Sequence, residues 1–491
     1  MEQGNDRRSN WRSRLIWNRA LLWVSGTLVV VMVAIGVVLD LRDGDRDDAG
    51  SNPRESPVPA AGAPSGAAPA AGAALPVGKD FDARRGWQFE VAADAYTSGR
   101  AGFPHTAFAR RAQQVVYLDE SGAVRAVSAA DGREVWSWGP AGLEYAARAA
   151  LVVVDTPGGE YVAVVSEQEA APVVGAYPEP ITFVDLAAVS ATGPLSLARR
   201  VTVEGLGWQA VATPTGLILD SSTATSVAID PQTGIQTPMA PRNVSCPQGT
   251  CATSPVLSTA RGAVAAWTQS TGCDRYQQAG GPSCALGWEV GTAWASTAVA
   301  PAGKPVGVPL GVTDRYLVAA WQGTTNLITN PELNSAQNTV FAVHDLASGA
   351  VIAQTACRSP YTLGLYPGSA QPSTQASPGG RFLASGQVVF DLQARTGRCL
   401  TADAARLGVD IWSVDDRGTV YGTVGDTAVF GQLPVPVAPT FNPSWSVQAV
   451  RVPLGGQVEL LPPGTLVPFA IAADGTGVFR TGDAVGAYGG T

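Results

Sequence analysis

The sequence predicts an all-β fold that is assembled from one repeated unit. The clearest copy is the stretch 115–138, VVYLDESGAVRAVSAADGREVWSW, in which three runs of strand-forming residues are separated by two tight turns. Degenerate variants of this stretch recur as far as the C-terminus. The composition agrees, because 56 glycines and 36 prolines among 491 residues, with only 15% charged residues, are typical of a protein dense in turns.

Each part of this stretch has a local reason for its predicted structure. Glu120–Gly122 is expected to turn because glycine tolerates a positive φ angle. Val124 and Ala126 follow at a spacing of two and would share one face of a strand. Ala130–Gly132 ends in Asp-Gly, which is a strong hairpin signal, and an aromatic strand that contains Trp136 comes next.

Strand openings of the same kind can be identified at eight places along the chain. They begin at Val115, Gly159, Gly216, Gly262, Asp314, Gly380, Gly418 and Gly475. Their spacing of a few tens of residues suits a four-stranded β-propeller blade, which takes roughly 40–50 residues. The turn Asp415–Val420 also aligns with Asp119–Val124, as if both were the same turn of the unit. The alternative, a chain of independent β-sandwiches, would show turns at short spacing without a repeated unit.

The second turn of the unit also recurs. The pattern Ala-x-Asp-x-x-Thr-Gly occurs at Ala228–Gly234, nearly at Ala126–Gly132 with Trp136, and more loosely at Asp345–Gly349 and Asp391–Gly397. It resembles the repeat of pyrroloquinoline-quinone (PQQ)-type β-propellers, Ala-x-Asp-x-x-Thr-Gly-x-x-x-Trp. The resemblance covers residues 115 to about 478, and it implies a propeller fold.

In that family the tryptophan of the repeat docks one blade against the next. The resemblance therefore implies a set of blade-docking residues, namely Asp131, Gly132, Trp136, Asp230, Thr233 and Gly234. Pro238 and Ala353 stand at the tryptophan position in two other copies. The set of docking tryptophans is therefore expected to be incomplete.

Residues 80–491 are predicted to form a single β-propeller of seven or eight four-stranded blades, with eight favoured. The run WQFEV at 87–91 precedes the first full unit, and a strand pattern near 478–480 follows the last opening. Pairing of these two segments would close the ring and remove two exposed sheet edges.

The N-terminus predicts a membrane anchor. Residues 1–19 form a basic tail with five arginines, and Ala20–Leu39 then contains no charged residue. A helix of this length spans about 30 Å, the thickness of the hydrocarbon core. We expect a transmembrane helix over 20–40 in the cell membrane, a cytoplasmic N-terminus and an extracytoplasmic body. A cleaved signal peptide is the alternative, but no small-residue cleavage site follows Leu39.

Residues 41–79 are predicted to be a disordered linker. They are acidic at first and then rich in proline, alanine and glycine, a composition that cannot bury a core. The whole chain has a net charge of −8 although its tail is basic, so the body must be strongly acidic. An acidic body argues against a nucleic-acid partner.

The cysteines predict disulfides. All six lie in the part that is expected to be exported: Cys246, Cys251, Cys273, Cys284, Cys357 and Cys399. Fifteen connectivities are possible, and nearest-neighbour pairing (246–251, 273–284 and 357–399) is the simplest. A metal site is not expected, because His105 and His344 are the only histidines and no Cys-x-x-Cys occurs.

No catalytic motif is present. The chain has no Gly-x-Ser-x-Gly or His-Glu-x-x-His sequence, and it lacks the adjacent cysteines that PQQ dehydrogenases use beside their cofactor. We therefore assign no cofactor and no catalytic residue, and we expect a binding or scaffold module for a protein, a peptide or a cell-envelope polymer. The alternative is a glycan- or ester-directed hydrolase with carboxylates at the central funnel. Its candidates, Asp119-Glu120 and Asp415-Asp416, fall in turns, where acids are common for local hydrogen bonding.

Overall fold

The computed structural model describes residues 74–91, 105–119, 121–139, 149–168, 181–189, 198–204, 209–220, 226–239, 242–246, 249–259, 261–268, 286–302, 304, 306–322, 338–358, 374–401, 408–424 and 448–491. The chain divides into two compact units, 1–57 and 58–491, and all described residues belong to the second. The predicted tail, transmembrane helix and most of the linker lie outside the described residues. Within the described part of the chain, no helix is long and apolar enough to cross a membrane.

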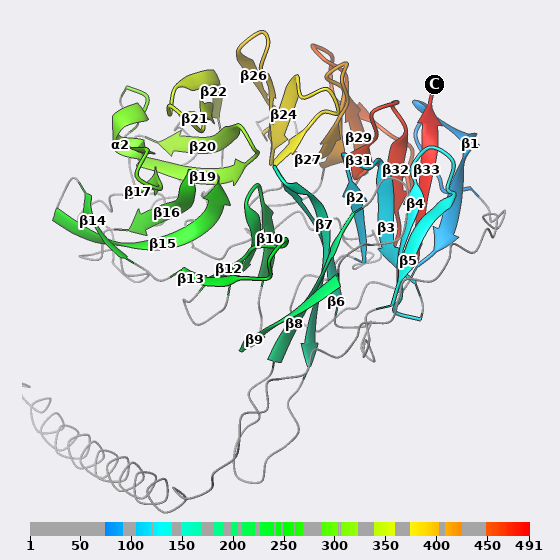
Figure 1. The fold of residues 1–491 in the computed structure, drawn as a ribbon. Helices are drawn as coiled ribbons and strands as arrows, with labels where there is room; N and C mark the ends of the chain where they lie inside the picture. The colour runs from blue at the N-terminus through cyan, green and yellow to red at the C-terminus, as the bar shows by residue number, and fades with distance from the viewer. Residues whose placement is uncertain are drawn as a thin grey trace, which may run out of the picture. The chain divides into compact units, whose positions relative to one another are not determined.

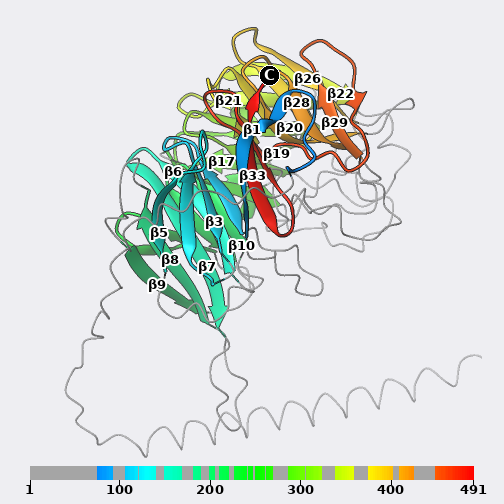
Figure 2. The same ribbon diagram turned by 90° about the vertical axis from the view of Figure 1, so that its right-hand side faces the viewer.

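The described strands form eight antiparallel groups, which we call blades 1 to 8 (Figures 1 and 2). Blade 1 contains β2 (Thr106–Ala109), β3 (Gln114–Leu118), β4 (Val124–Ser128) and β5 (Glu134–Trp138). Blade 2 contains β6 (Ala149–Thr156), β7 (Gly159–Gln168), β8 (Ile181–Ala188) and β9 (Ala198–Glu204). Blade 3 contains β10 (Gln209–Thr213), β11 (Gly216–Asp220), β12 (Ser226–Ile229) and β13 (Gln236–Met239). Blade 4 contains β14 (Arg242–Cys246), β15 (Gly249–Thr259), β16 (Gly262–Thr268), β17 (Leu286–Val290) and β18 (Trp294–Ala295), and the short helix α2 (Ser296–Val299) follows it.

The second half of the chain continues in the same way. Blade 5 contains β19 (Val306–Val312), β20 (Tyr316–Gln322), β21 (Asn338–Asp345) and β22 (Val351–Arg358). Blade 6 contains β23 (Thr374–Ala376), β24 (Phe382–Ser385), β25 (Val388–Asp391) and β26 (Thr396–Cys399). Blade 7 contains β27 (Val409–Val414), β28 (Val420–Val424), β29 (Gln448–Val452) and β30 (Glu459–Leu460). Blade 8 contains β31 (Ala470–Ile471), β32 (Gly477–Arg480), β33 (Ala484–Gly490) and, from the start of the body, β1 (Phe81–Glu90). Blades 5 and 6 are joined into one eight-stranded sheet by a single parallel pair, Gln354 with Thr396.

This arrangement confirms the predicted all-β fold of mostly four-stranded antiparallel sheets, as in a β-propeller, and the eight groups of described strands agree with the predicted number of blades, although blade 4 has a fifth strand, β14. All eight predicted openings lie within two residues of the start of the second strand of a blade, counted in blade 4 from β15. The local reason is clearest in blades 2, 3 and 4. In these blades the turn before β7, β11 or β16 ends in a glycine with a positive φ angle. The carbonyl of this glycine accepts a hydrogen bond from the Oγ1 of the threonine three residues earlier, as Gly262 does from Thr259.

The predicted equivalence of the Asp119 and Asp415 turns is wrong. The Asp119 turn joins the second and third strands of blade 1, whereas the Asp415 turn joins the first and second strands of blade 7. Because successive strands are antiparallel, these two turns lie at opposite ends of their blades. Both carboxylates accept the backbone N–H groups two and four residues later, so the same local chemistry serves two different places in the unit.

The ring closes as predicted, through a blade shared by both ends of the body. In the register of β1 and β33, Trp87 lies opposite Ala487, and β33 continues into β32 and β31. In blade 1, Trp136 of the outer strand lies opposite Ala126 of the third strand in the same way. Blade 8 therefore contains the same Ala–Trp pair, but its tryptophan comes from the N-terminal end of the body and its alanine from the C-terminal end.

Clusters of buried apolar residues join neighbouring blades around the ring. They connect blade 1 with 2, 2 with 3, 4 with 5, 5 with 6, 6 with 7, 7 with 8 and 8 with 1. Among the described residues, blades 3 and 4 share no such cluster, and from blade 3 only the partly buried Val211 packs against the cluster of blades 4 and 5. Among the described residues, the interface between blades 3 and 4 is therefore the one without a shared cluster of buried apolar residues.

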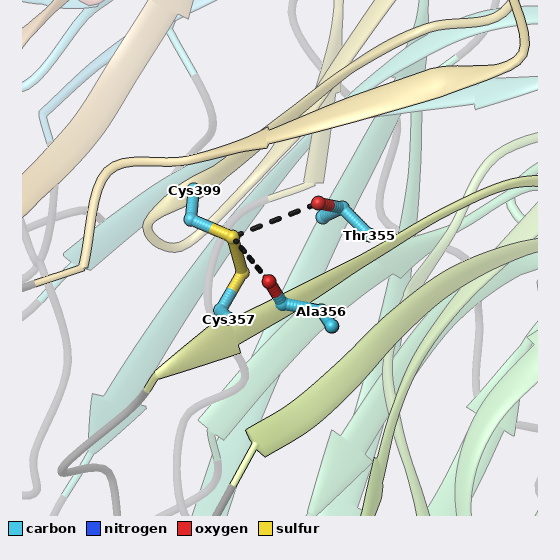
Figure 3. Close-up of a disulfide and its surroundings, with 4 residues drawn as sticks. All are labelled: Thr355, Ala356, Cys357 and Cys399. Atoms are coloured by element: carbon cyan, nitrogen blue, oxygen red, sulfur yellow. Dashed lines mark hydrogen bonds between the residues drawn. A yellow bond between two sulfur atoms is a disulfide. The ribbon is translucent and has the colours of Figure 1, made fainter.

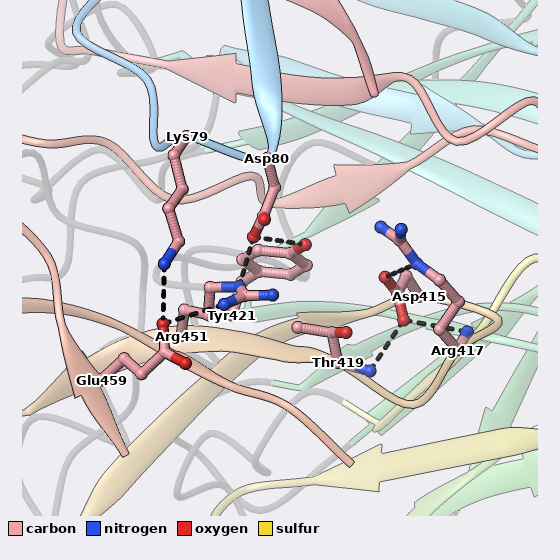
Figure 4. A network of polar contacts seen from close by, with 8 residues as sticks. All are labelled: Lys79, Asp80, Asp415, Arg417, Thr419, Tyr421, Arg451 and Glu459. Atoms are coloured by element: carbon pink, nitrogen blue, oxygen red, sulfur yellow. Dashed lines mark hydrogen bonds and ion pairs between the residues drawn. The ribbon is translucent and has the colours of Figure 1, made fainter. Parts of the chain in front are cut away.

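The folded body begins before Asp80, because the last linker residues pack on blades 7 and 8. Val77 forms a parallel bridge with Leu466, and the Leu466 N–H donates to the Pro76 carbonyl at 2.7 Å. Figure 4 shows the polar network beside this segment. The Asp80 carboxylate lies 2.5 Å from Arg451 Nε, and Lys79 Nζ lies 3.2 Å from a Glu459 oxygen. These contacts tie the entry of the chain to the outer strands of blade 7.

Candidate binding groove between blades 3 and 4

Among the described residues, a tryptophan of one blade docks on the second turn of the next blade at two places in the ring. In the first, Trp87 Nε1 donates to the Ala129 carbonyl at 3.0 Å, and the indole ring packs against Gly132. Gly132 has a φ angle of 71°, and a Cβ added to it would lie 2.5 Å from Trp87 Cγ. Asp131 is exposed in the same turn, where a hydrogen bond from Ser128 lowers its pKa. The glycine is thus needed both for the turn and for the close approach of the indole.

The second place lies between blades 4 and 5. Trp294 Nε1 donates to the Leu346 carbonyl at 3.0 Å, and its ring packs against Gly349, which corresponds to Gly132. The repeat pattern did not identify Trp87 or Trp294 as docking residues. Trp87 belongs to a repeat that is split between the two ends of the body, and Trp294 lies on a strand of only two residues.

Trp136 lies between blades 1 and 2, with only 1% of its surface exposed. It belongs to the cluster of buried residues that includes Leu151, Val162 and Val164 of blade 2. Its Nε1 donates to Gln114 Oε1 of its own blade at 2.9 Å. This tryptophan therefore fills the space between two blades, and its polar atom is satisfied within its own blade.

The turn Asp230–Gly234 docks blade 3 on blade 2 without a tryptophan. The Asp230 carboxylate accepts hydrogen bonds from the Gln232 N–H at 2.8 Å and from the Thr233 hydroxyl at 2.7 Å, which fixes the turn. The Thr233 carbonyl in turn accepts a hydrogen bond from Arg199 Nη1 on β9 at 2.9 Å. An arginine on the outer strand of blade 2 thus replaces the tryptophan that blades 8 and 4 use.

Pro238 stands four residues after Gly234, where Trp136 stands four residues after Gly132. It lies exposed on the outer strand β13, and so do its neighbours Gln236 and Thr237. Where Trp136 closes the gap between blades 1 and 2, a cavity of about 550 Å³ opens between blades 3 and 4 and is lined by Pro238. We call this cavity the groove.

The groove has an apolar floor and a hydroxyl-bearing edge. Its apolar lining includes side chains from both blades, namely Ile218, Ile229, Ile235 and Met239 from blade 3 and Ala263 and Ala265 from blade 4. Ile235 is 62% exposed at its rim. Thr215 of blade 3 and Ser258 of blade 4 share a short hydrogen bond across the interface. Asp230 is the one charged residue among the described residues that line the groove, and none of them is aromatic.

Comparisons with known proteins return no family. No family model matches the chain, and no curated protein matches it. Among solved structures, the crystal structure of BamB from Moraxella catarrhalis covers 82% of this chain and 97% of its own, at 13% identity and a TM-score of 0.33. The fold assignment given above therefore rests on the strand pairings of this chain.

Blades 5 and 6 are linked where Ala353 replaces the tryptophan of the repeat. Cys357 on β22 and Cys399 on β26 form a disulfide across this interface, with their Cα atoms 5.6 Å apart (Figure 3). The Cys399 sulfur also lies 3.7 Å from Thr355 Oγ1 and 3.3 Å from the Ala356 carbonyl oxygen. A covalent link is therefore present at an interface that lacks the docking indole.

The pairing of the other four cysteines lies outside the described part of the structure. Cys246 and Cys251 lie on the neighbouring strands β14 and β15, but their side chains are outside the described part of the structure. Cys273 and Cys284 also lie outside it. The pairings 246–251 and 273–284 stay predictions.

The carboxylates proposed for a hydrolase are held by internal partners. Asp119 accepts from Arg125 Nε at 2.6 Å, and Asp415 accepts from Arg417 Nε at 3.2 Å. Burial opposes ionisation of Asp119, but hydrogen bonds from Ser121 and Arg125 outweigh it and lower the pKa. Because these two turns also lie at opposite ends of their blades, they do not form one carboxylate pair. Glu120 lies outside the described residues.

Charged residues also meet at the turns between first and second strands. Arg110 Nη1 of blade 1 donates to the Ala376 carbonyl of blade 6 at 2.5 Å. Arg111 lies 2.7 Å from Asp155 of blade 2, and Glu160 accepts the Arg111 N–H at 2.8 Å. These contacts link blades 1, 2 and 6, so we assign this cluster a structural role. In the described part of the chain, no three potential ligands among His, Cys, Asp and Glu are grouped to hold a metal.

Proposed function

We propose that this chain is an exported β-propeller, held at the cell membrane by one N-terminal helix, that binds a partner protein or peptide in the groove. The observation that carries the proposal is the open interface between blades 3 and 4, where an exposed outer strand borders an apolar cavity of about 550 Å³. Ligand sites in proteins have volumes of roughly 300–1,000 Å³ and combine an apolar lining with a few polar groups. The groove meets both criteria.

The lining of the groove favours a protein segment over an envelope polymer. Its floor consists of aliphatic side chains, whose burial against an apolar partner is favourable. A hydroxyl-rich polymer would lose hydrogen bonds to water, and among the described lining residues only five side chains carry polar groups that could replace them: Thr213, Thr215, Asp230, Thr237 and Ser258. The exposed outer strand β13 also offers an edge along which an extended segment can lie.

The remaining parts of the proposal rest on the sequence. The uncharged stretch Ala20–Leu39 would anchor the chain, and the basic tail would stay in the cytoplasm. The linker up to residue 73, which would reach about 110 Å when fully extended, would allow the propeller to reach partners away from the membrane surface.

A pull-down from envelope extract tests the function. The bait is the full-length protein in detergent, as the natural chain, as Pro238→Trp, or as Leu460→Trp. Leu460 is 61% exposed on the outer strand of blade 7, so its variant adds the same side chain away from the groove. We expect a partner that the natural chain and Leu460→Trp recover and that Pro238→Trp loses. Equal recovery by all three baits would contradict the proposal.

A further inference from the structure

We infer that the groove accepts an aromatic side chain of the partner, flanked by an arginine or lysine that pairs with Asp230. This inference deepens the proposed function and depends on it. Two independent features carry it: the tryptophan that is missing from blade 3 and the Asp230 carboxylate, which forms no ion pair with a described residue although Arg199 hydrogen-bonds the Thr233 carbonyl of the same turn.

The first feature is the internal repeat. Blades 1 and 3 share the same turn, and the residue four positions after its glycine is Trp136 in one blade and Pro238 in the other. Trp136 is buried against blade 2, whereas Pro238 is exposed and lines an open cavity against blade 4. The groove is thus the counterpart of a site that holds an indole elsewhere in the molecule. An aromatic ring buries roughly 150–250 Å², so a ring supplied by a partner would cover the apolar floor.

The second feature is the charge at the edge of the groove. Asp230 makes hydrogen bonds within its own turn, but no described residue forms an ion pair with it. The corresponding turn of blade 6 differs, because Asp391 lies 2.6 Å from Arg381 Nη2. No basic residue lines the groove among the described residues. A cation on the partner would therefore meet an unpaired carboxylate, and charge complementarity would fix the direction of the bound segment.

The test uses three small probes whose binding can be followed by ligand-observed ¹⁹F NMR. They are the N-acetyl, C-amide dipeptides fluorotryptophan-arginine, fluorotryptophan-glutamate and trifluoroalanine-arginine, each titrated into the full-length protein in detergent. We expect the fluorotryptophan-arginine probe to bind most tightly and the trifluoroalanine-arginine probe to bind least. An equal response to all three probes, or no binding by any, would overturn the inference.

Matched variants locate the binding. Pro238→Trp should abolish binding of the fluorotryptophan-arginine probe because the added indole occupies the groove, whereas Leu460→Trp should leave it unchanged. Asp230→Asn keeps a side-chain oxygen for the turn and removes the charge, so it should weaken this probe about two- to fivefold, as expected for a partly exposed ion pair. Asp345→Asn makes the same change in the turn of blade 5, away from the groove, and should have no effect.

The outcomes of these tests distinguish a failure of this inference from a failure of the proposed function. If Pro238→Trp fails to fold, Ala263→Phe fills the groove from the opposite wall and takes its place. If Asp345→Asn weakens the probe as much as Asp230→Asn does, the role of Asp230 is refuted. If the pull-down recovers a partner through the groove while the probes show no preference for an aromatic group with a cation, only this inference fails.

Discussion

Trp87 donates a hydrogen bond from its indole nitrogen to the carbonyl oxygen of Ala129, 42 residues later in the chain, at 3.0 Å. Trp87 belongs to the strand that completes blade 8, and Ala129 belongs to the second turn of blade 1. This contact therefore joins the first strand of the body to the first full repeat, at the point where the ring closes. Its loss should affect the whole domain and not one end of it.

The first prediction concerns this closure. Trp87→Ala removes a nearly fully buried indole and should lower the free energy of unfolding by about 3–5 kcal/mol, the usual range for such truncations. Chemical denaturation should show one cooperative transition moved to lower denaturant concentration. A chain truncated before Asp474 lacks β32 and β33 and should fail to form a stable ring. Stepwise unfolding, with most blades intact in the truncated chain, would indicate an open solenoid instead.

The second prediction concerns the disulfide of blades 5 and 6. Cys357 and Cys399 are separated by 42 residues, and closing a loop of this length stabilises the folded state by about 4 kcal/mol in the chain-entropy model. The double variant Cys357→Ala with Cys399→Ala should lose stability of this order in urea denaturation. A loss below about 1 kcal/mol would show that the parallel pair between β22 and β26 holds the interface without the covalent link.

The third prediction concerns the remaining cysteines. If all three predicted disulfides form, titration of the denatured, unreduced protein with a thiol reagent should detect no free thiol. Mass spectrometry of unreduced digests should then show which of Cys246, Cys251, Cys273 and Cys284 are linked. Two or more free thiols would remove at least one of the pairings 246–251 and 273–284.

The fourth prediction concerns acid stability. His344 is buried among Trp288, Trp294 and Trp321. Its Nε2 accepts from Trp321 Nε1 at 3.2 Å, so its Nδ1, which is 2.9 Å from the Gly349 carbonyl oxygen, must carry the proton. Burial lowers the pKa of His344 from its ordinary value of 6.5. The unfolded chain then binds a proton more readily than the folded chain, so stability should fall as the pH drops below about 6.5 towards the folded-state pKa.

The control for this prediction is His344→Gln, which cannot titrate in this range. Thermal unfolding of both proteins between pH 5 and pH 7.5 should give a steeper decline in Tm for the natural chain. Parallel pH profiles would mean that His344 is not the group responsible.

The fifth prediction concerns the anchor. External protease should release the propeller from intact cells and leave the basic tail protected, because Ala20–Leu39 is expected to remain in the membrane. A mature protein that begins after Leu39 and appears in the soluble fraction would contradict the anchor.

The blades and their closure could be predicted from sequence because the signals are local and repeated. Gly159, Gly216 and Gly262 end hairpin turns with positive φ angles, and each is the first residue of the strand that follows, β7, β11 or β16. The place of an individual turn within its blade could not be predicted. Asp119 and Asp415 make the same backbone hydrogen bonds in an Asp-x-x-Gly turn, so their sequences do not distinguish opposite ends of a blade.

The groove could not be predicted from the sequence. Pro238 at the tryptophan position predicted a missing docking residue, but Ala353 at the same position in blade 5 is buried at an interface that carries a disulfide. Whether such a replacement leaves a cavity depends on which side chains of the next blade reach the interface, here Ala263 and Ala265, and the repeat pattern around Pro238 does not specify them. The docking role of Trp87 could not be predicted from the repeat pattern either, because its cross-strand partner Ala487 lies at the other end of the body.

The most direct test of the groove as the binding site is photo-cross-linking in intact cells. A photoreactive phenylalanine derivative at Thr237, which lines the groove on β13, is compared with the same residue at Leu460 on the outer strand of blade 7. We predict that the probe at Thr237 forms a discrete adduct with one partner protein and that the probe at Leu460 does not. The same adducts at both positions, or none at Thr237, would contradict the assignment of the groove as the site where this propeller binds its partner.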